Sequence, residues 1–275
     1  AKHIAAAERL ARPAAAGIYS GALRMAYESL ESRIVRSAPV VVVAPAGVDT
    51  VAMVARAHLK GGRAQGPLVL VDGTSTRDHD LARWKDKRVS PLGLADRGLL
   101  VLIDGASLPH DVQRLIAHSL LERRPPWERA EPLDIALAMT TSLPISKLRE
   151  EGVLDPQFAS RIDDALTEHI VLPRLRDRME DLRAMVSDRL ARQGLRTRGI
   201  PLGIDDKAMA VLIEYPFEGE ELELDAIVIK LVRACPEQTV RKEHVDQVLF
   251  GIAPAPREDE LSVRRNRRKS TAKAK

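Results

Sequence analysis

The loop at Ala44–Thr50 (APAGVDT) lies between a run of four valines and a helical pattern. A loop in this position, before a helix N-terminus, is where α/β proteins bind phosphate groups. That chemistry requires glycines for close backbone approach, a Lys for the β- and γ-phosphates and a Ser or Thr for magnesium. Of these residues the loop keeps a single glycine, Gly47. The Lys position is occupied by Thr50 or Val51, and Asp49 adds negative charge. A structural role for Asp49, as the N-cap of the helix that follows, is sufficient to account for this loop. Phosphate binding is the alternative.

A second candidate follows the apolar run Leu99–Ile103, which ends in Asp104. An apolar strand ending in Asp is the magnesium-side motif of nucleotide-hydrolysing folds, in which a neighbouring Glu activates water. Gly105 occupies the position of that Glu. We therefore expect no catalytic residue here, and a degenerate nucleotide site at most.

A third cluster combines an indole with four basic groups: Arg83, Trp84, Lys85, Lys87 and Arg88. One interpretation is a contact surface for an acidic protein partner. The other is a solvated turn with Trp84 packed inward. The sequence leaves both open.

Metal and cysteine chemistry find little support. The chain has one cysteine, Cys235, so it has no internal disulfide framework and no cysteine-based zinc motif. Its seven histidines show no ligand spacing, and we expect no metal. The single cysteine, with no signal peptide or membrane-spanning run in the sequence, predicts a cytoplasmic protein and no membrane contact.

The net charge of +4 arises at the end of the chain. The last twelve residues carry seven basic groups and no acid, while the other 263 carry 36 basic against 39 acidic groups. A mildly acidic body gives no general argument for nucleic-acid binding. Only the basic tail could contact phosphates, with a disordered, solvated terminus as the simpler interpretation.

Short apolar runs alternate with amphipathic helical stretches as far as residue 172, which predicts a five-stranded parallel sheet with flanking helices. After Pro173 the pattern indicates helices only, the first ending at Gly194. We expect an N-terminal arm or linker (1–16), an α/β domain (17–172), a helical lid domain (173–250) and a disordered basic tail (251–275). The expected strands are Val40–Val43, Leu68–Val71, Leu99–Ile103, Ile135–Met139 and His169–Leu172.

Several segments, in order, resemble the AAA+ domain of sigma-54-dependent transcriptional activators, a P-loop NTPase-like fold. Leu172–Leu182 (LPRLRDRMEDL) is similar to that family's P-P-L-R-E-R-x-E-D-I linker into the lid. Leu100–Pro109, Asp134–Leu148 and Tyr215–Leu224 are similar to its L-F-L-D-E-I-x-x-L-P, sensor-strand and Y-x-W-P-G-N-V-R-E-L segments. The resemblance implies a role in bacterial signalling or transcription regulation.

The departures from the family fall on its working residues. Thr141 stands where the sensor strand has Asn, and Leu222 where the second sensor has Arg. In Phe158–Leu166, alanines replace the trans-acting arginines, and Asp72–Gly98 is too short for the loop that touches the sigma factor. Arginine and lysine stabilise the transition state of phosphoryl transfer, so losing them together predicts no hydrolysis.

The resemblance and its departures together predict a non-catalytic, pseudo-ATPase AAA+ module that acts through protein–protein contacts, without a cofactor. The alternative is an ATP-binding activator ATPase with divergent motifs, which would use ATP and magnesium. Without the bridging Lys and arginines, and with like charges at Glu218–Glu223, we expect a monomer or a small nucleotide-independent oligomer.

Overall fold

The computed structural model describes residues 2–15, 20–77, 80–128, 131–163 and 168–252. The predicted basic tail lies outside the described residues, apart from Gly251 and Ile252. The chain forms two compact units, residues 1–184 with 217–223, and residues 185–216 with the chain from 224 onward. The segment 217–223 thus belongs to the first unit although it lies late in the chain.

A five-stranded sheet forms the centre of the first unit, with the strand order β2-β3-β4-β1-β5. All its pairings are parallel, which confirms the expected fold class. Each strand lies within two residues of its predicted range, because these apolar runs are the segments that can be covered on both faces. The strands are β1 (Val40–Val43), β2 (Leu68–Asp72), β3 (Leu99–Ile103), β4 (Ala136–Thr141) and β5 (Glu168–Val171).

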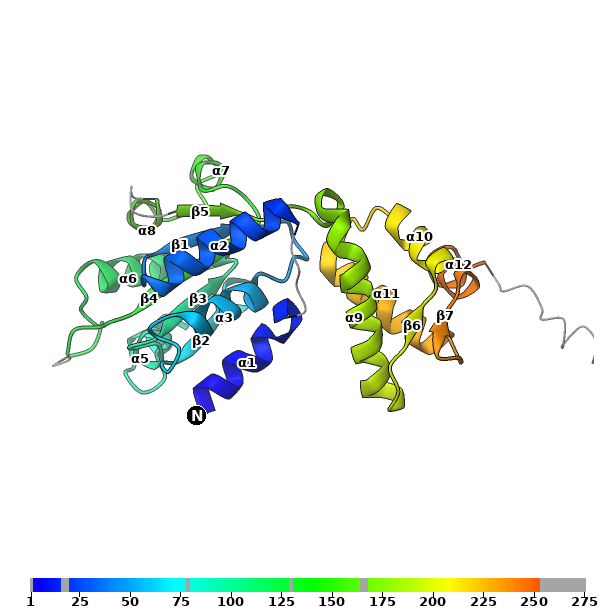
Figure 1. Ribbon diagram of the computed structural model, residues 1–275. Helices are drawn as coiled ribbons and strands as arrows, with labels where there is room; N and C mark the ends of the chain where they lie inside the picture. Colours follow the sequence, from blue (N-terminus) through cyan, green and yellow to red (C-terminus); the bar gives the residue numbers. More distant parts are fainter. Residues whose placement is uncertain (1, 16–19, 78–79, 129–130, 164–167, 253–275) are drawn as a thin grey trace, which may run out of the picture. The chain divides into compact units, whose positions relative to one another are not determined.

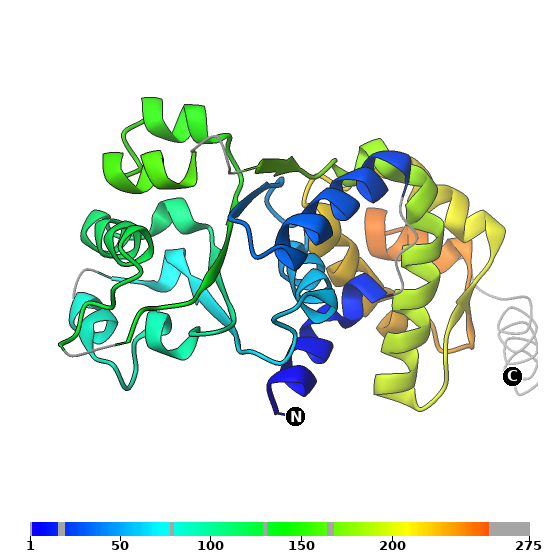
Figure 2. The ribbon, with the colours of Figure 1, turned by 60° about the vertical axis from the view of Figure 1, so that its left-hand side comes forward.

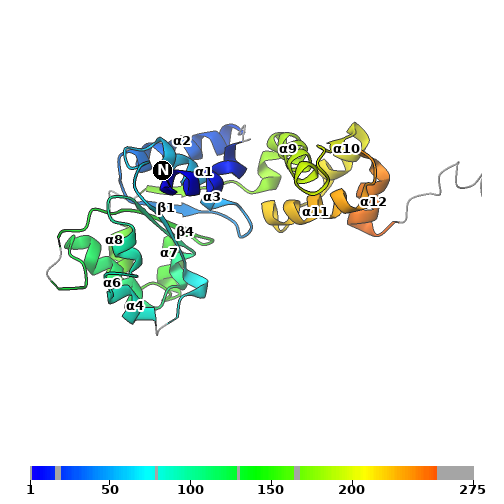
Figure 3. The same ribbon diagram turned by 90° about the horizontal axis from the view of Figure 1, so that it is seen from below.

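Helices cover both faces of this sheet (Figure 3). Val40 and Val42 of β1 pack into one hydrophobic cluster with α2 and α3, while Val41 and Val43 pack into another with α6 and α8. Successive side chains of a strand point to opposite faces of the sheet, so the valines of β1 contribute to two separate hydrophobic clusters. The helices are α2 (Gly21–Val35), α3 (Thr50–Lys60), α4 (Leu81–Lys85), α5 (Pro91–Leu94), α6 (His110–Leu121), α7 (Ile145–Glu150) and α8 (Pro156–Ile162), with 3₁₀ turns η1 (Gly73–Ser75) and η3 (Gly105–Ser107).

The N-terminal segment, which the sequence analysis expects to be an arm or linker, forms a helix. Helix α1 (Lys2–Ala15) packs against α3 (Figure 1). Ala7 and Ala11, one helical turn apart, are buried. Small side chains at that spacing lie on one face of the helix and allow close helix packing.

The C-terminal part is mainly helical, as expected, with two corrections. Gly203–Ile204 (β6) and Thr239–Val240 (β7) form a two-residue parallel pair, so this part is not helical throughout. The long helix α9 (Met179–Arg198) passes through Gly194 and ends before Gly199, whose φ is +73° (Figure 2, yellow-green). The remaining elements are η4 (Leu175–Arg178), α10 (Asp206–Glu214), α11 (Glu220–Ala234) and α12 (Lys242–Phe250).

Gly194 has a packing role inside α9. A Cβ at this position would lie 2.6 Å from Leu202 Cδ1 and 2.7 Å from the carbonyl oxygen of Ile200. The glycine therefore permits close approach of the returning chain, and it does not stop the helix. Within the described ranges, no helix is long and apolar enough to cross a membrane.

Candidate functional site

The sheet brings the predicted nucleotide-site residues to one edge. Strands β3, β4 and β1 are neighbours, so Asp104, Thr141 and the loop at Ala44–Thr50 all follow the carboxyl ends of adjacent parallel strands. The backbone N–H of Ala44 donates to the carbonyl of Thr141 over 2.9 Å. In open α/β sheets this edge is where ligands bind.

The loop after β1 is in contact with the segment Phe217–Glu223. Gly47 has a φ of +97°, and a Cβ built on it would lie 2.4 Å from the carbonyl oxygen of Gly219. The N–H of Leu222 donates to the carbonyl oxygen of Gly47 over 3.0 Å. The backbone of the segment Phe217–Glu223 thus lies directly against Gly47, the glycine at which a phosphate-binding loop would approach its ligand.

Asp49 caps helix α3. Its Oδ1 accepts a hydrogen bond from the N–H of Ala52 over 3.0 Å. The N–H of Thr50 donates to the carbonyl of Val48 over 2.9 Å. These contacts satisfy N–H groups at the helix N-terminus that a phosphate-binding loop would direct at an anion.

Asp104 lies in the left-handed region, with a φ of +46°. Its N–H donates to Oγ1 of Thr140 over 3.1 Å, and its Oδ2 accepts from Oγ of Ser107 over 2.6 Å. A Cβ on the buried Gly105 would lie 2.6 Å from Cγ of Met139. Gly105 stands where nucleotide-hydrolysing folds have a catalytic glutamate. A side chain at this position would not fit unless Met139 moved.

Thr141 is buried, and its hydroxyl is engaged in the turn that follows β4. Oγ1 donates to the carbonyl of Leu143 over 3.2 Å and accepts from the N–H of the same residue over 3.3 Å. The side chain at the sensor position therefore stabilises its own loop.

A clamp that sequence reasoning missed holds the segment Phe217–Glu223 in place. The carboxylate of Glu220 accepts from the N–H of Leu175 over 2.6 Å, and Glu221 forms an ion pair with the guanidinium of Arg178. Glu220, Glu221 and Arg178 are all buried. The sequence signals for this pairing were the acidic run Glu218–Glu223 and the linker motif Leu172–Leu182, which contain its two partners.

These contacts correct part of the expectation for Glu218–Glu223. From the sequence, these glutamates are expected to be exposed like charges that face a neighbouring subunit. Glu220 and Glu221 instead turn inward, where a backbone N–H and a guanidinium satisfy them. Leu222, which follows them, is 70% exposed, at the position where the resemblance places an arginine.

The cluster Arg83–Arg88 divides between core and surface. Trp84 is only 2% exposed and packs into the core with α6 and α8, so its inclusion in a contact surface was wrong. Its indole is buried because α4 packs against α6 and the apolar ring joins the hydrophobic cluster there. Arg83, Lys85, Lys87 and Arg88 remain exposed.

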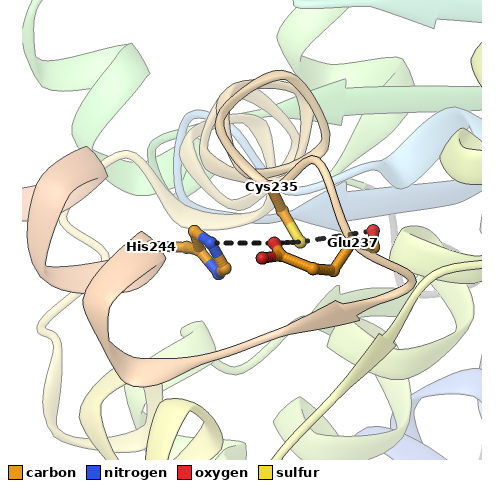
Figure 4. A group of neighbouring side chains, drawn as sticks. All are labelled: Cys235, Glu237 and His244. Atoms are coloured by element: carbon orange, nitrogen blue, oxygen red, sulfur yellow. Dashed lines mark hydrogen bonds and ion pairs between the residues drawn. The ribbon is translucent and has the colours of Figure 1, made fainter. Parts of the chain in front are cut away.

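A separate group, Cys235, Glu237 and His244, lies in the second unit (Figure 4). One sulfur, one carboxylate oxygen and one ring nitrogen lie within 4.8 Å of one another, close enough to share a metal ion. Nε2 of His244 lies 3.4 Å from Oε2 of Glu237, and the thiol of Cys235 lies 3.3 Å from the carbonyl oxygen of Thr239.

The tautomer of His244 disfavours a metal at this group. Nδ1 accepts from the N–H of Arg241 over 3.0 Å, and burial lowers the pKa of His244, so the neutral ring carries its proton on Nε2. A metal-bound histidine usually donates its second ring N–H, the reverse of this arrangement. The geometry fits a hydrogen-bonded cluster that links the turn after α11 to α12, and the absence of a metal remains a prediction.

The curated relatives are regulatory proteins. The chain is 27% identical over 233 residues to the glycerol metabolism operon regulatory protein of Citrobacter freundii, a match that covers 79% of this chain and 35% of the relative. It is 24% identical over 196 residues to the regulatory protein AtoC of Escherichia coli, covering 66% of this chain and 42% of that protein. The chain thus spans less than half of the length of these relatives. No family model matches.

Solved structures share the fold. NtrX from Brucella abortus in complex with ATP superposes with a TM-score of 0.72 at 21% identity, covering 90% of this chain and 58% of NtrX. The Holliday junction branch migration motor RuvB of Thermotoga maritima superposes with a TM-score of 0.56 at 12% identity, over 84% of this chain and 69% of RuvB. The sheet order, the linker and the regulatory relatives together support the resemblance of this chain to the AAA+ domains of sigma-54-dependent transcriptional regulators.

Proposed function

We propose that this AAA+ domain neither binds nor hydrolyses ATP and regulates transcription through contacts with another protein. The observation that carries the proposal is the contact between Gly47 and the segment Gly219–Leu222. A phosphate cradle needs free backbone N–H groups and space above its glycine. Here a backbone carbonyl occupies the space over Gly47, and Asp49 caps the helix behind it.

The charges near this loop support the same proposal. Asp49 and Glu220 are acidic, the loop Ala44–Thr50 has no Lys, and the guanidinium of Arg178 is paired with Glu221. A triphosphate carries several negative charges, so these nearby carboxylates oppose its binding. Gly105 and Leu222 further replace the groups that would activate water and neutralise the γ-phosphate.

We further propose that the exposed basic groups Arg83, Lys85, Lys87 and Arg88 contact an acidic protein surface. Asp86 lies among them and pairs with Arg88, so three cations remain in excess. Exposed charges of this kind steer association more than they contribute affinity. The basic tail is a second candidate surface, and we place the protein in the cytoplasm from its cysteine usage.

A second candidate function is an ATP-binding activator. It is favoured by the similarity to NtrX, whose crystal structures were determined with ATP and with ADP. In this alternative the segment Phe217–Glu223 would have to leave Gly47 before nucleotide enters. That movement would break the Leu222–Gly47 hydrogen bond and the buried pair of Arg178 and Glu221.

A titration with ATP or ADP and magnesium, followed by thermal unfolding and calorimetry, separates the two candidates. A ligand that binds the folded state stabilises it by about 2.7 kcal/mol at a hundredfold excess over Kd. We expect no saturable shift up to millimolar nucleotide and no turnover above background. Turnover that Asp104→Ala abolishes would overturn the proposal.

Light scattering with and without ATP tests the assembly that follows from this proposal. We expect a monomer or small oligomer whose mass ATP does not change, because the chain lacks the Lys and arginines that join neighbours through nucleotide. A hexamer that forms only with ATP would contradict both the expected assembly and the non-catalytic proposal.

A further inference from the structure

A cavity of about 500 Å³ is lined by the carboxyl-terminal halves of α9 and α11, within the second unit. Each helix contributes residues at positions i, i+3 and i+4, which share one helical face. These residues are Gln193, Arg196 and Thr197 of α9 and Ile229, Val232 and Arg233 of α11. The volume falls within the range of sites that bind small organic molecules.

Part of the lining is apolar. Ile229, Val232 and Pro236 line the cavity, and Ile229 and Val232 are neighbours on one face of α11. Water in contact with apolar surface is unfavourable, so a ligand that covers this surface with an apolar body gains free energy. This part of the cavity therefore favours a hydrocarbon chain or ring.

The charged residues among the described lining are all arginines, namely Arg196, Arg198 and Arg233. Arg198 is engaged with the protein itself, because Nη1 donates to the carbonyl oxygen of Cys235 over 2.6 Å and Nη2 donates to that of Pro236 over 2.6 Å. These carbonyls follow the last turn of α11, where the helix dipole places partial negative charge that would repel an anion. Arg198 offsets this charge and holds the turn that forms one wall.

Arg196 and Arg233 are available to a ligand. Both are exposed, and neither side chain forms a hydrogen bond or an ion pair with another described residue. Two like charges that line one cavity repel each other, and an anion between them would remove that cost. A guanidinium group presents parallel N–H groups that match the two oxygens of a carboxylate.

We propose that this cavity binds a small organic carboxylate with an apolar body, of the medium-chain fatty acid type. The apolar body covers Ile229, Val232 and Pro236, and the carboxylate lies at Arg196 and Arg233. A ligand with only one of these two parts would satisfy only one part of the lining. The proposal does not depend on whether ATP binds, because the candidate nucleotide-site residues belong to the first unit.

Isothermal calorimetry on the full chain with octanoate, acetate and octanol tests the proposal. Octanoate should bind saturably at one site. Acetate lacks the apolar body and octanol lacks the charge, so each should bind at least about tenfold more weakly, a difference that calorimetry resolves readily. Added salt should weaken the binding of octanoate and leave that of octanol unchanged, because it screens only the charge interaction.

Arg233→Gln is the first variant, because this exposed side chain makes no described contact whose loss would impair folding. It should weaken octanoate binding about fivefold, the loss expected for an ion pair at a solvated site, and leave octanol binding unchanged. Arg196→Gln should act in the same direction from the other helix. Lys230→Gln is the matched control, because Lys230 is an exposed cation of α11 that does not line the cavity, and it should leave binding unchanged.

Ile229→Ala tests the apolar part and should weaken octanoate and octanol binding alike. Thermal unfolding of each variant shows that it is folded at the temperature of the titration. The proposal is overturned if octanoate does not bind at millimolar concentration, if octanol binds as tightly as octanoate, or if Lys230→Gln weakens octanoate binding as much as Arg233→Gln. An Ile229→Ala variant that binds both ligands like the wild type would also overturn it.

Discussion

The N–H of Leu222 donates a hydrogen bond to the carbonyl oxygen of Gly47, and this bond joins the start of α11 to the loop after β1. Leu222 stands where the resemblance places a phosphate-sensing arginine, and Gly47 is the glycine that remains of the phosphate loop. The two positions that would contact the same nucleotide therefore contact each other.

Gly47→Ala should lower the free energy of unfolding and displace the segment Phe217–Glu223 from the loop after β1. The new methyl group would lie 2.4 Å from the carbonyl of Gly219, in a residue whose φ is +97°. Together these effects should cost about 2–4 kcal/mol, measured by urea unfolding. Gly152→Ala is the control, because Gly152 has a φ of +68° but its added methyl would meet no described atom within 4 Å. It should cost only about 1 kcal/mol. Equal losses would refute the close contact.

Gly105→Glu should lower stability and bring no ATPase activity. The side chain would have to displace Met139 in the core, and overpacking of this kind costs about 1–3 kcal/mol. Thermal unfolding and a phosphate-release assay measure the two effects. Gly62→Glu, at a position with open space around it, controls for the added charge and should unfold near the wild-type temperature. Hydrolysis by the Gly105→Glu variant would contradict the prediction.

Arg178→Met should destabilise the first unit strongly, because it leaves the carboxylate of Glu221 buried and without its cation. Breaking such a pair from one side costs about 3–5 kcal/mol. The double variant Arg178→Met/Glu221→Leu should recover much of that loss in chemical denaturation.

Lys60→Met controls for loss of a surface ion pair. Lys60 pairs with Glu31 over 2.7 Å with a side chain that is 48% exposed, and exposed pairs contribute about 0–1 kcal/mol. A double variant of Arg178 and Glu221 no more stable than Arg178→Met would argue against the buried pair as the source of the loss.

Acid should destabilise the fold through His58. This residue is buried in α3, and burial lowers its pKa below the ordinary value of 6.5, against the opposing effect of a hydrogen bond to the backbone of Gly66. The unfolded chain then binds the proton more readily than the folded one. Stability should therefore be full above about pH 6.5 and fall as pH decreases below it, by up to about 1.4 kcal/mol per pH unit.

Urea unfolding between pH 5 and pH 8 measures this dependence. His58→Gln should flatten the slope, although His244, whose pKa is also lowered by burial, retains a part of it. The same measurement on His118→Gln controls for the loss of a histidine at an exposed position. A slope that persists fully in His58→Gln would show that other groups cause it.

The sequence alone determined the sheet and the departures from the family. Strands such as Val40–Val43 and Leu99–Ile103 were predictable because a continuous apolar run must be covered on both faces, a local property of the chain. The loss of the Lys, Glu and Arg positions was readable in the same way, because a residue type at a motif position needs no knowledge of its neighbours.

Only the tertiary structure decided which groups meet. The sequence predicted Glu220 and Glu221 to be exposed like charges, but Leu175 and Arg178 satisfy them in the structure. The sequence left the place of Trp84 open, and the structure buries it. Periodicity reports how much of a side chain is covered, but not what covers it. Contacts between segments distant in the chain, including those of Arg198 with the turn after α11, follow from the packing of the whole unit.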